Sequence, residues 1–201
     1  MKIISFEGIE GVGKTTQINL LKEYLEHKGL TVQVLREPGS TNTGEKIRDI
    51  LLNSDDDISN ETELLLMFAA RSELICQKIN NTSCDFLLLD RFFDASIAYQ
   101  GYGRKLSIEF IKSLISFIDC PIPDKSILLD ISVNDGFSRK SNDIKDRIES
   151  AGNNFFNNVR NGYLKIAEES PDRFLVIDAS NEINIIHKEI INYINYKNEI
   201  I

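Results

Sequence analysis

The chain has 201 residues, which is enough for one α/β domain with a central sheet covered on both faces. Its 42% hydrophobic and 27% charged residues are typical of a globular chain. The net charge of −8 argues against a general nucleic-acid or acidic-membrane surface, so neither partner is expected. A polyanionic ligand must therefore be held by a local cluster of lysine and arginine.

Export and membrane signals are absent from the sequence. The N-terminus enters an apolar strand pattern without a preceding basic segment, and no apolar run approaches the roughly 18 residues that cross a bilayer. The three cysteines, Cys76, Cys84 and Cys120, are odd in number and form no CxxC pair, so neither a disulfide framework nor a zinc site is expected. These features predict a cytoplasmic protein.

Strand and helix patterns alternate along the whole chain, which predicts a parallel sheet with crossover helices. The expected elements, in chain order, are a strand at 2–7, a helix at 14–28, a strand at 31–35, helices at 44–52 and 61–79, a strand at 86–89, helices at 92–100 and 107–118, a strand at 126–129, helices at 134–142 and 146–169, a strand at 174–177 and a helix at 182–196. No repeat or low-complexity linker divides the chain, so residues 1–201 are expected to form a single domain.

A glycine-rich motif follows the first expected strand and precedes a helical pattern. It reads Gly8-Ile9-Glu10-Gly11-Val12-Gly13-Lys14-Thr15, the strand–loop–helix order of a phosphate-binding loop. Its glycines let backbone N–H groups turn inward around an anion, and the helix N-terminus adds positive potential. Lys14 is expected to reach the β- and γ-phosphates of a nucleoside triphosphate, and the Thr15 hydroxyl to ligate Mg²⁺. The alternative is a glycine-rich turn without a ligand.

A second motif, Asp90-Arg91, ends the apolar run 86–89. An aspartate at the carboxyl end of a buried strand is suited to hold Mg²⁺ or its water shell, and Arg91 faces the same crevice. Because a guanidinium meets phosphate oxygens bidentately, Arg91 favours a kinase whose acceptor bears a phosphate over a switch GTPase. Two alternatives remain: a surface ion pair of Asp90, and Asp130, which ends another strand without a following arginine.

In order and spacing, these motifs and the segments around them resemble the bacterial type of thymidylate kinase from end to end. The matching segments are 6–16, 36–41, 44–48, 66–71, 90–101 and 146–149. The most discriminating is 90–101, which carries Ser-x-x-Ala-Tyr-Gln-Gly after Asp-Arg. The resemblance implies a P-loop NTPase fold: a five-stranded parallel sheet, helices on both faces and a small helical lid at about 136–149. It also implies transfer of the γ-phosphoryl group of ATP to dTMP, with Mg²⁺, giving dTDP for dTTP biosynthesis.

The resemblance implies roles for individual residues. Those expected to bind ATP are Gly8, Ile9, Glu10, Gly11, Val12, Gly13, Lys14, Thr15, Thr16 and Arg147. Those expected to bind dTMP are Glu37, Arg48, Phe68, Arg71, Arg91, Ser96, Tyr99 and Gln100. Thr15 and Asp90 are expected to hold Mg²⁺, and the expected catalytic residues are Lys14, Arg91, Arg139 and Glu10.

The spacing of the acceptor residues agrees with these roles. Phe68 and Arg71 are three apart on an expected helix and share a face, so Phe68 can stack on a base while Arg71 donates to its edge, by resemblance the O4 of thymine. Ser96 and Gln100 also share a face, and Tyr99 is placed by the family near the sugar 2′ position. Core packing for Phe68 and ordinary helix-surface positions for the polar residues are the alternatives.

The acceptor phosphate is expected to lie between two arginines. By resemblance, Arg48 and Arg91 clamp this phosphate with Glu37 near the reaction centre; alone, Glu37 and Arg48 read equally well as surface charges.

The lid assignment depends on the phosphate loop, which has Glu10 and no arginine. In the family, this implies that the lid supplies the cation that closes over the γ-phosphate. Arg139 is the first candidate and Arg147, which can serve ATP binding or lid folding, is the second. A helical surface ion-pair network is the alternative. Ser40, where relatives usually have glycine, departs from the family pattern without removing a required charge.

Two competing functions are weighed against this one. Another nucleotide or deoxynucleoside kinase on the same fold is disfavoured by Arg48 and Arg91 together, which imply an acceptor that already bears phosphate. A nucleotide-dependent switch is expected to carry a guanine-reading Asn-Lys-x-Asp motif, which the sequence lacks. The family implies a homodimer, for which the helices at 61–79 and 107–118 are the candidate interface, although core packing explains their apolar residues equally well. The expected ligands are the small molecules ATP and dTMP.

Overall fold

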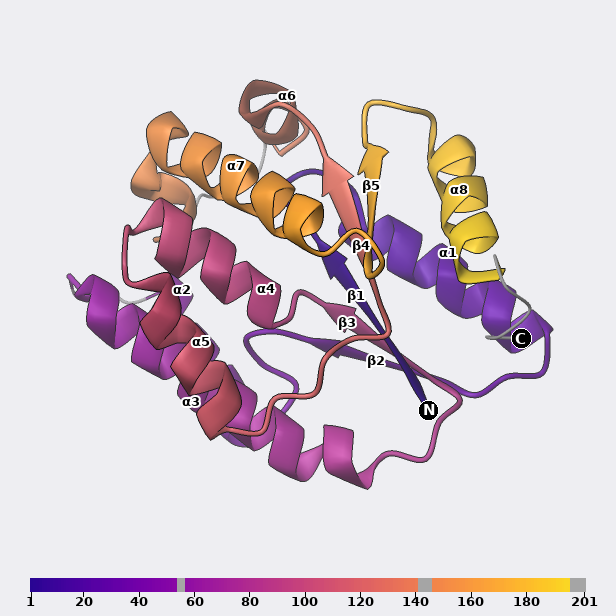
Figure 1. Cartoon of the computed structure of the whole chain (residues 1–201), viewed down its shortest axis with the longest axis horizontal. Coiled ribbons are helices and arrows are strands. Elements are labelled where there is room, and N and C mark those ends of the chain that lie inside the picture. Colours follow the sequence, from indigo (N-terminus) through magenta and orange to yellow (C-terminus); the bar gives the residue numbers. More distant parts are fainter. Residues whose placement is uncertain (54–56, 141–145, 196–201) are drawn as a thin grey trace.

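The computed structural model describes residues 1–53, 57–140 and 146–195. Five parallel strands form one sheet in the order β2-β3-β1-β4-β5 (Figure 1). Their bounds are β1 (Lys2–Glu7), β2 (Val32–Arg36), β3 (Phe86–Asp90), β4 (Lys125–Asp130) and β5 (Phe174–Asp178). The central strands β1, β3 and β4 are buried along nearly their whole length, as their continuous apolar runs predict for a sheet covered on both faces.

Helices cover both faces of this sheet (Figure 1). On one face lie α1 (Lys14–His27) and α8 (Ile183–Asn195). The opposite side carries α2 (Asn42–Asn53), α3 (Asn60–Gln77), α4 (Phe93–Ser96), its π-helical continuation η2 (Ile97–Gly103), α5 (Ile108–Phe117) and α7 (Asn153–Glu169). Short elements are α6 (Val133–Ser138) and the 3₁₀ turns η1 (Ile79–Asn81) and η3 (Glu149–Ala151).

The expected elements are present, with one clear error after β4. The predicted helix 146–169 is wrong at its start, because the helix begins only at Asn153. Gly152 has a φ of 86°, a left-handed conformation that separates the 3₁₀ turn η3 from α7. The predicted helix 134–142 ends at Ser138, and residues 141–145 of the expected lid lie outside the described residues.

The register of the sheet sets the position of the two motifs. Phe6 of β1 pairs with Asp90 of β3, so the loop after β1 and Arg91 after β3 leave the sheet side by side. This is the carboxyl edge, where open parallel sheets place their ligands. Within the described ranges, no helix combines the length and the apolar character needed to cross a membrane.

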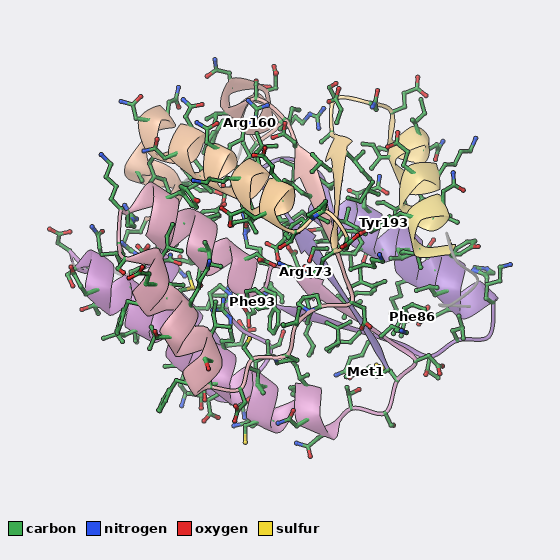
Figure 2. The ribbon with its side chains drawn as sticks, viewed as in Figure 1. Met1, Phe86, Phe93, Arg160, Arg173 and Tyr193 are labelled. Carbon is green, nitrogen blue, oxygen red and sulfur yellow. The ribbon has the colours of Figure 1, made fainter. Side chains whose placement is uncertain are left out.

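A buried ion pair joins the first turn of α4 to the residue that precedes β5. Arg173 donates to both carboxylate oxygens of Asp94, at 2.6 and 2.9 Å, and to Ser126 Oγ at 2.8 Å. Figure 2 shows Arg173 near Phe93 and Tyr193; its guanidinium carbon lies 5.4 Å from the Phe93 ring centroid, and its carbonyl accepts from the Tyr193 hydroxyl. The Asp94 side chain is 1% exposed, so its charge has little water to stabilise it.

Removing the cation should therefore be costly. We expect Arg173→Met to lower the free energy of unfolding by about 3 kcal/mol, because it leaves the Asp94 carboxylate buried without its partner. Urea unfolding measures the change. Arg36→Met, which breaks the exposed Arg36–Glu45 pair, is the matched control and should cost less than about 1 kcal/mol. Equal losses in the two variants would contradict a structural role for the Asp94–Arg173 pair.

Candidate active site

The loop between β1 and α1 has the backbone of a phosphate-binding loop. Gly8, Gly11 and Gly13 have φ values of 132°, 73° and 91°, which side chains disfavour. Lys14 lies under the loop and donates to the carbonyls of Gly8 and Ile9 at 3.2 and 2.9 Å. Burial, with the nearby Arg91 charge, lowers the pKa of Lys14 to about 8. The loop is therefore closed around an ammonium group that an anion can attract.

Helix α6 packs directly onto this loop through backbone contact. A Cβ atom at Gly11 would lie 1.9 Å from the Gly136 carbonyl oxygen, and one at Gly136 would lie 2.6 Å from the Glu10 carbonyl oxygen. Neither position can therefore carry a side chain without backbone movement. This contact places Arg139, at the end of α6, beside the loop.

Arg139 lines a hollow next to the phosphate loop. The hollow measures about 1090 Å³, is open to solvent, and is bordered by Gly11, Val12, Gly13, Thr16, Arg139 and residues 179–186 at the start of α8. Arg139 is exposed and donates to the Ala179 carbonyl at 3.0 Å. Thr15 and Thr16 are exposed at the N-terminus of α1. Four loop residues and Arg139 thus meet at one hollow, and their roles in ATP binding and catalysis stay predictions.

A second cavity, of about 550 Å³, lies on the other side of Glu10. Its polar lining residues are Glu10, Glu37, Arg48, Arg71, Arg91, Ser96, Tyr99, Gln100 and Asp146. All the residues predicted for dTMP except Phe68 are therefore brought together. Phe68 lies under Arg71, whose guanidinium carbon is 4.8 Å from the Phe68 ring centroid. Its stacking on a base stays a prediction.

At one end of this cavity, Arg91 and Glu10 form an ion pair. Arg91 Nη2 donates to Glu10 Oε1 and to the Tyr99 hydroxyl, both at 2.8 Å, and Tyr99 donates to Glu10. Arg91 has a φ of 66°, a strained conformation for a residue with a side chain, which turns it back toward the loop. Burial raises the pKa of Tyr99 well above its ordinary value, so this hydroxyl keeps its proton.

Arg48 lies at the same cavity without a carboxylate partner among the described residues. Its Nη1 donates to the Pro38 carbonyl at 3.0 Å. Burial, with the charges of Arg36 and Arg91, lowers the pKa of Arg48, and the charges of Glu45 and Asp146 oppose this shift. This end of the cavity is suited to an anion.

The other end is built on Arg71. Arg71 Nε and Nη2 both meet Glu37 Oε2, at 2.8 and 2.7 Å, and Nη1 donates to Ser96 Oγ at 3.0 Å. Burial raises the pKa of Glu37, and the charge of Arg71 opposes this shift. Glu37 Oε1 is buried and accepts no hydrogen bond within the described part of the chain, so this oxygen can still accept one.

Glu63 is a buried carboxylate that the sequence analysis missed. It accepts from Gln100 Nε2 at 3.0 Å, from Arg104 Nη2 at 3.0 Å and from Arg147 Nη2. Arg147 therefore lies beside the 550 Å³ cavity and not at the hollow near the phosphate loop, and its role in ATP binding stays a prediction. Glu63, Met67 and Arg71 recur every four residues on α3, and this helical spacing was the available signal.

Thr15 and Asp90 are the residues predicted from the sequence to hold a divalent cation. Asp90 ends β3, is half-buried, and its charge acts on Lys14 and Arg91. A hydroxyl and a carboxylate are the donors that Mg²⁺ prefers, and they lie at the phosphate loop, so these residues fit the cation. Asp130, the alternative to Asp90, already has a cationic partner. Arg160 of α7, labelled in Figure 2, donates to both of its carboxylate oxygens, at 2.7 and 2.8 Å. In the described ranges, no group of three or more His, Cys, Asp or Glu is arranged to hold a metal.

Comparisons with known proteins agree with this geometry. A family model described as Thymidylate kinase matches residues 6–190. A thymidylate kinase from Thermoanaerobacter sp. (strain X514) is 44% identical over 96% of this chain and 97% of its own length. One from Vesicomyosocius okutanii subsp. Calyptogena okutanii (strain HA) is 48% identical over 90% of this chain and 91% of its own length. The crystal structure of thymidylate kinase from Ehrlichia chaffeensis superposes with a TM-score of 0.76, at 32% identity, over 95% of this chain and 96% of that one.

The chain belongs to the thymidylate kinase family. The family resemblance, the P-loop NTPase fold and the assignment to a kinase, all predicted from the sequence, are confirmed.

Glu7 is a second buried carboxylate of this thymidylate kinase family member, and no role was predicted for it from the sequence. It ends β1, and it accepts from the Phe92 backbone N–H at 3.0 Å and from the Tyr163 hydroxyl at 3.1 Å. Burial and the charge of Asp94 raise the pKa of Glu7 to about 8. Glu7 thus fixes the backbone directly after Arg91 and holds a proton at neutral pH.

This proton makes stability depend on pH. The Glu7 carboxyl has a pKa of about 8 in the folded chain against an ordinary value of 4.5, so between these values the unfolded state binds fewer protons and the free energy of unfolding falls as the pH rises. Glu7→Gln removes this contribution. Urea unfolding between about pH 5 and pH 7 measures the effect. The free energy of unfolding of the variant, minus that of the parent, should rise with pH by up to about 1.4 kcal/mol per pH unit.

Glu45→Gln is the control for this experiment. A hydrogen bond from the Ser40 backbone N–H, with the hydrogen bonds and charge of Arg36, lowers the pKa of Glu45, so the contribution of Glu45 to stability is lost only as the pH falls below 4.5. Parallel pH profiles for the parent and Glu7→Gln would show that Glu7 is ionised throughout the window.

Proposed function

We propose that this protein transfers the γ-phosphoryl group of ATP to dTMP, giving dTDP for dTTP biosynthesis. The 550 Å³ cavity carries the proposal: it has arginines at one end, a fixed guanidinium and amide at the other, and the phosphate loop beside it. A monophosphate with a pyrimidine base presents an anion and a polar edge, which match these two ends.

Acceptor binding follows from the charges at each end. Arg48 and Arg91 receive the monophosphate, and a phosphate oxygen near Arg91 competes with Glu10 for its guanidinium. Arg71 and Gln100 face the base, with Ser96 between them and Phe68 below Arg71. Tyr99 holds Glu10 and Arg91 in place through its hydroxyl. The deoxyribose then spans the middle of the cavity.

ATP is proposed to lie along the phosphate loop, with residues 8–16 around its phosphates. Lys14, which now donates to two loop carbonyls, turns to the β- and γ-phosphates. Thr15 and Asp90 would hold Mg²⁺, which supplies positive charge to the phosphate oxygens when bound. Arg139 is the proposed lid cation, because α6 packs on the loop and its guanidinium is bound only to a backbone carbonyl in the described structure.

The chemistry needs positive charge between two anionic groups. Phosphoryl transfer passes through a loose transition state, and catalysis is mostly positioning and charge stabilisation. Lys14 and Arg139 supply charge from the ATP side and Arg91 from the acceptor side, with Glu10 between them setting the position of Arg91. No side chain has to form a covalent intermediate.

We also propose a cytoplasmic homodimer that acts on small molecules and binds neither nucleic acid nor membrane. Exposed apolar side chains on α3 and α5 support the dimer: Leu65, Phe110 and Phe117 are 54%, 51% and 82% exposed. Large apolar side chains exposed in this way are typical of protein interfaces.

A panel of nucleoside monophosphates tests the proposed reaction. In a coupled ADP-release assay with ATP and Mg²⁺, we expect dTMP to be the best acceptor and dUMP to be used roughly 10- to 200-fold less efficiently, since only a methyl group distinguishes them. Lys14→Met, which removes the loop cation, is the negative control. Equal kcat/KM values for dUMP and dTMP would contradict the assigned base pocket, and no turnover of dTMP would contradict the function.

Two arginine variants separate the two substrate sites. Arg71→Ala should weaken dTMP binding more than tenfold, because it removes a charged donor, while ATP binding is retained. Arg139→Ala should instead lower kcat by about 10³-fold with dTMP binding retained. Calorimetric titration with each nucleotide, on the same preparations, measures both affinities. Equal loss of ATP and dTMP binding in Arg71→Ala would contradict its assignment to the acceptor.

A further inference from the structure

We propose that Glu63 is a positioning residue that determines which pyrimidine the acceptor cavity accepts, by fixing the orientation of the Gln100 amide. The inference rests on the proposed function, since it concerns the base of the monophosphate. Glu63 itself does not line the cavity, so it acts through Gln100.

The direction of the Gln100 amide follows from the chemistry of its partner. Gln100 is 1% exposed, lines the cavity, and donates Nε2 to Glu63 Oε1 at 3.0 Å. An ionised carboxylate can only accept hydrogen bonds, so the amide nitrogen must face Glu63 and the amide oxygen must face away. Gln100 therefore offers an acceptor at the cavity end.

Glu63 is held ionised and in place by two arginines. Arg104 donates to both of its oxygens, at 3.2 Å from Nε and 3.0 Å from Nη2, and Arg147 donates to Oε2. Burial alone raises the pKa of Glu63, but the hydrogen bonds from Arg104 and Gln100 outweigh it and bring the pKa below its ordinary value. The carboxylate therefore stays an acceptor at neutral pH.

Arg71 supplies the complementary donor. Its side chain donates three hydrogen bonds, from Nε to Glu37, from Nη1 to Ser96 and from Nη2 to the Phe92 carbonyl, and Nη2 also lies 2.7 Å from Glu37 Oε2 as an ion pair. A guanidinium carries five N–H groups, so one N–H on Nη1 remains for a ligand. The base end of the cavity thus presents one fixed donor and one fixed acceptor.

This pair distinguishes the pyrimidines. Thymine and uracil present an accepting O4 next to a donating N3–H, which match Arg71 and Gln100. Cytosine presents a donating amino group and an accepting N3, so both contacts would set like against like. A Gln100 amide turned by half a rotation would accept cytosine at N3, and the Glu63 carboxylate prevents that rotation.

The test is the ratio of kcat/KM for dTMP to kcat/KM for dCMP. In Glu63→Gln, the introduced amide can donate as well as accept, so the Gln100 amide is free to turn. We expect the ratio to fall about 10- to 100-fold, the effect of losing one directional hydrogen bond in a buried site. Glu63→Asp, which keeps the charge for the arginines and withdraws the carboxylate from Gln100, should lower the ratio in the same direction. This second variant keeps the test valid if Glu63→Gln does not fold.

Two controls separate positioning from a general structural role. Arg104→Met removes one of the two arginines of Glu63 and leaves Arg147 and the contact with Gln100, so the ratio should fall much less than in Glu63→Gln. Gln100→Leu removes the amide, so adding Glu63→Gln to this variant should not lower the ratio further. A fall in Arg104→Met as large as in Glu63→Gln, or an undiminished further fall in the Gln100→Leu background, would overturn the proposal.

The parent chain, measured in the same assay, distinguishes the two failures. A parent that does not phosphorylate dTMP contradicts the proposed function. A parent that prefers dTMP, with the same ratio in Glu63→Gln and Glu63→Asp, overturns only the role of Glu63.

Discussion

The acceptor site depends on arginines that are held by carboxylates from other elements. Arg71 is bound by Glu37, Arg91 by Glu10, and both Arg104 and Arg147 by Glu63. Taking a charge out of water costs several kcal/mol, and an opposite charge offsets this only with good hydrogen-bond geometry. Such pairs therefore contribute position more than stability. Each carboxylate fixes the orientation of its guanidinium. The cavity therefore has donors and acceptors in fixed positions, although arginine side chains are otherwise flexible.

Arg48 and Arg139 follow a different rule. Both donate to backbone carbonyls, of Pro38 and Ala179, and neither forms an ion pair with a carboxylate in residues 1–53, 57–140 and 146–195. A carbonyl does not neutralise a guanidinium, so their charge remains available to phosphate groups. In a chain of net charge −8, these two arginines therefore supply local positive charge, and the proposed acceptor phosphate would add Arg91, for which it competes with Glu10.

The sequence predicted the local features and missed those that depend on distant residues. The phosphate loop and the five strands follow from motifs and hydrophobic patterns that are local in the chain, whereas the gathering of the acceptor residues was implied by the family resemblance. The bond from Glu63 to Gln100 joins residues that are 37 apart, and that from Glu7 to Phe92 joins residues that are 85 apart. No pattern along the chain reports which buried carboxylate meets which donor, although the four-residue spacing on α3 places Glu63 on the face of Arg71.

Ser40 shows how a departure from the family pattern is accommodated. Its φ of 63° lies in the left-handed region that favours glycine, which accounts for the glycine usual at this position. Its hydroxyl accepts from the Arg36 N–H at 2.8 Å and donates to the Arg36 carbonyl at 3.1 Å. These hydrogen bonds offset the cost of the left-handed backbone conformation. The sequence predicted that the change removes no required charge, and the hydrogen bonds give the local reason that the turn is retained.

The π-helical stretch η2 links the two ends of the acceptor cavity. The Arg104 N–H donates to the Tyr99 carbonyl at 2.8 Å, a bond that spans five residues where an α-helix spans four. The wider turn places neighbouring side chains differently from the α-helix expected at 92–100. Tyr99 reaches Glu10 and Arg91 at one end of the cavity, while Gln100 reaches Glu63 at the other. In the proposed function, these two consecutive residues hold the groups for the phosphate and for the base in register, so the backbone of one helical turn would set the distance between the two.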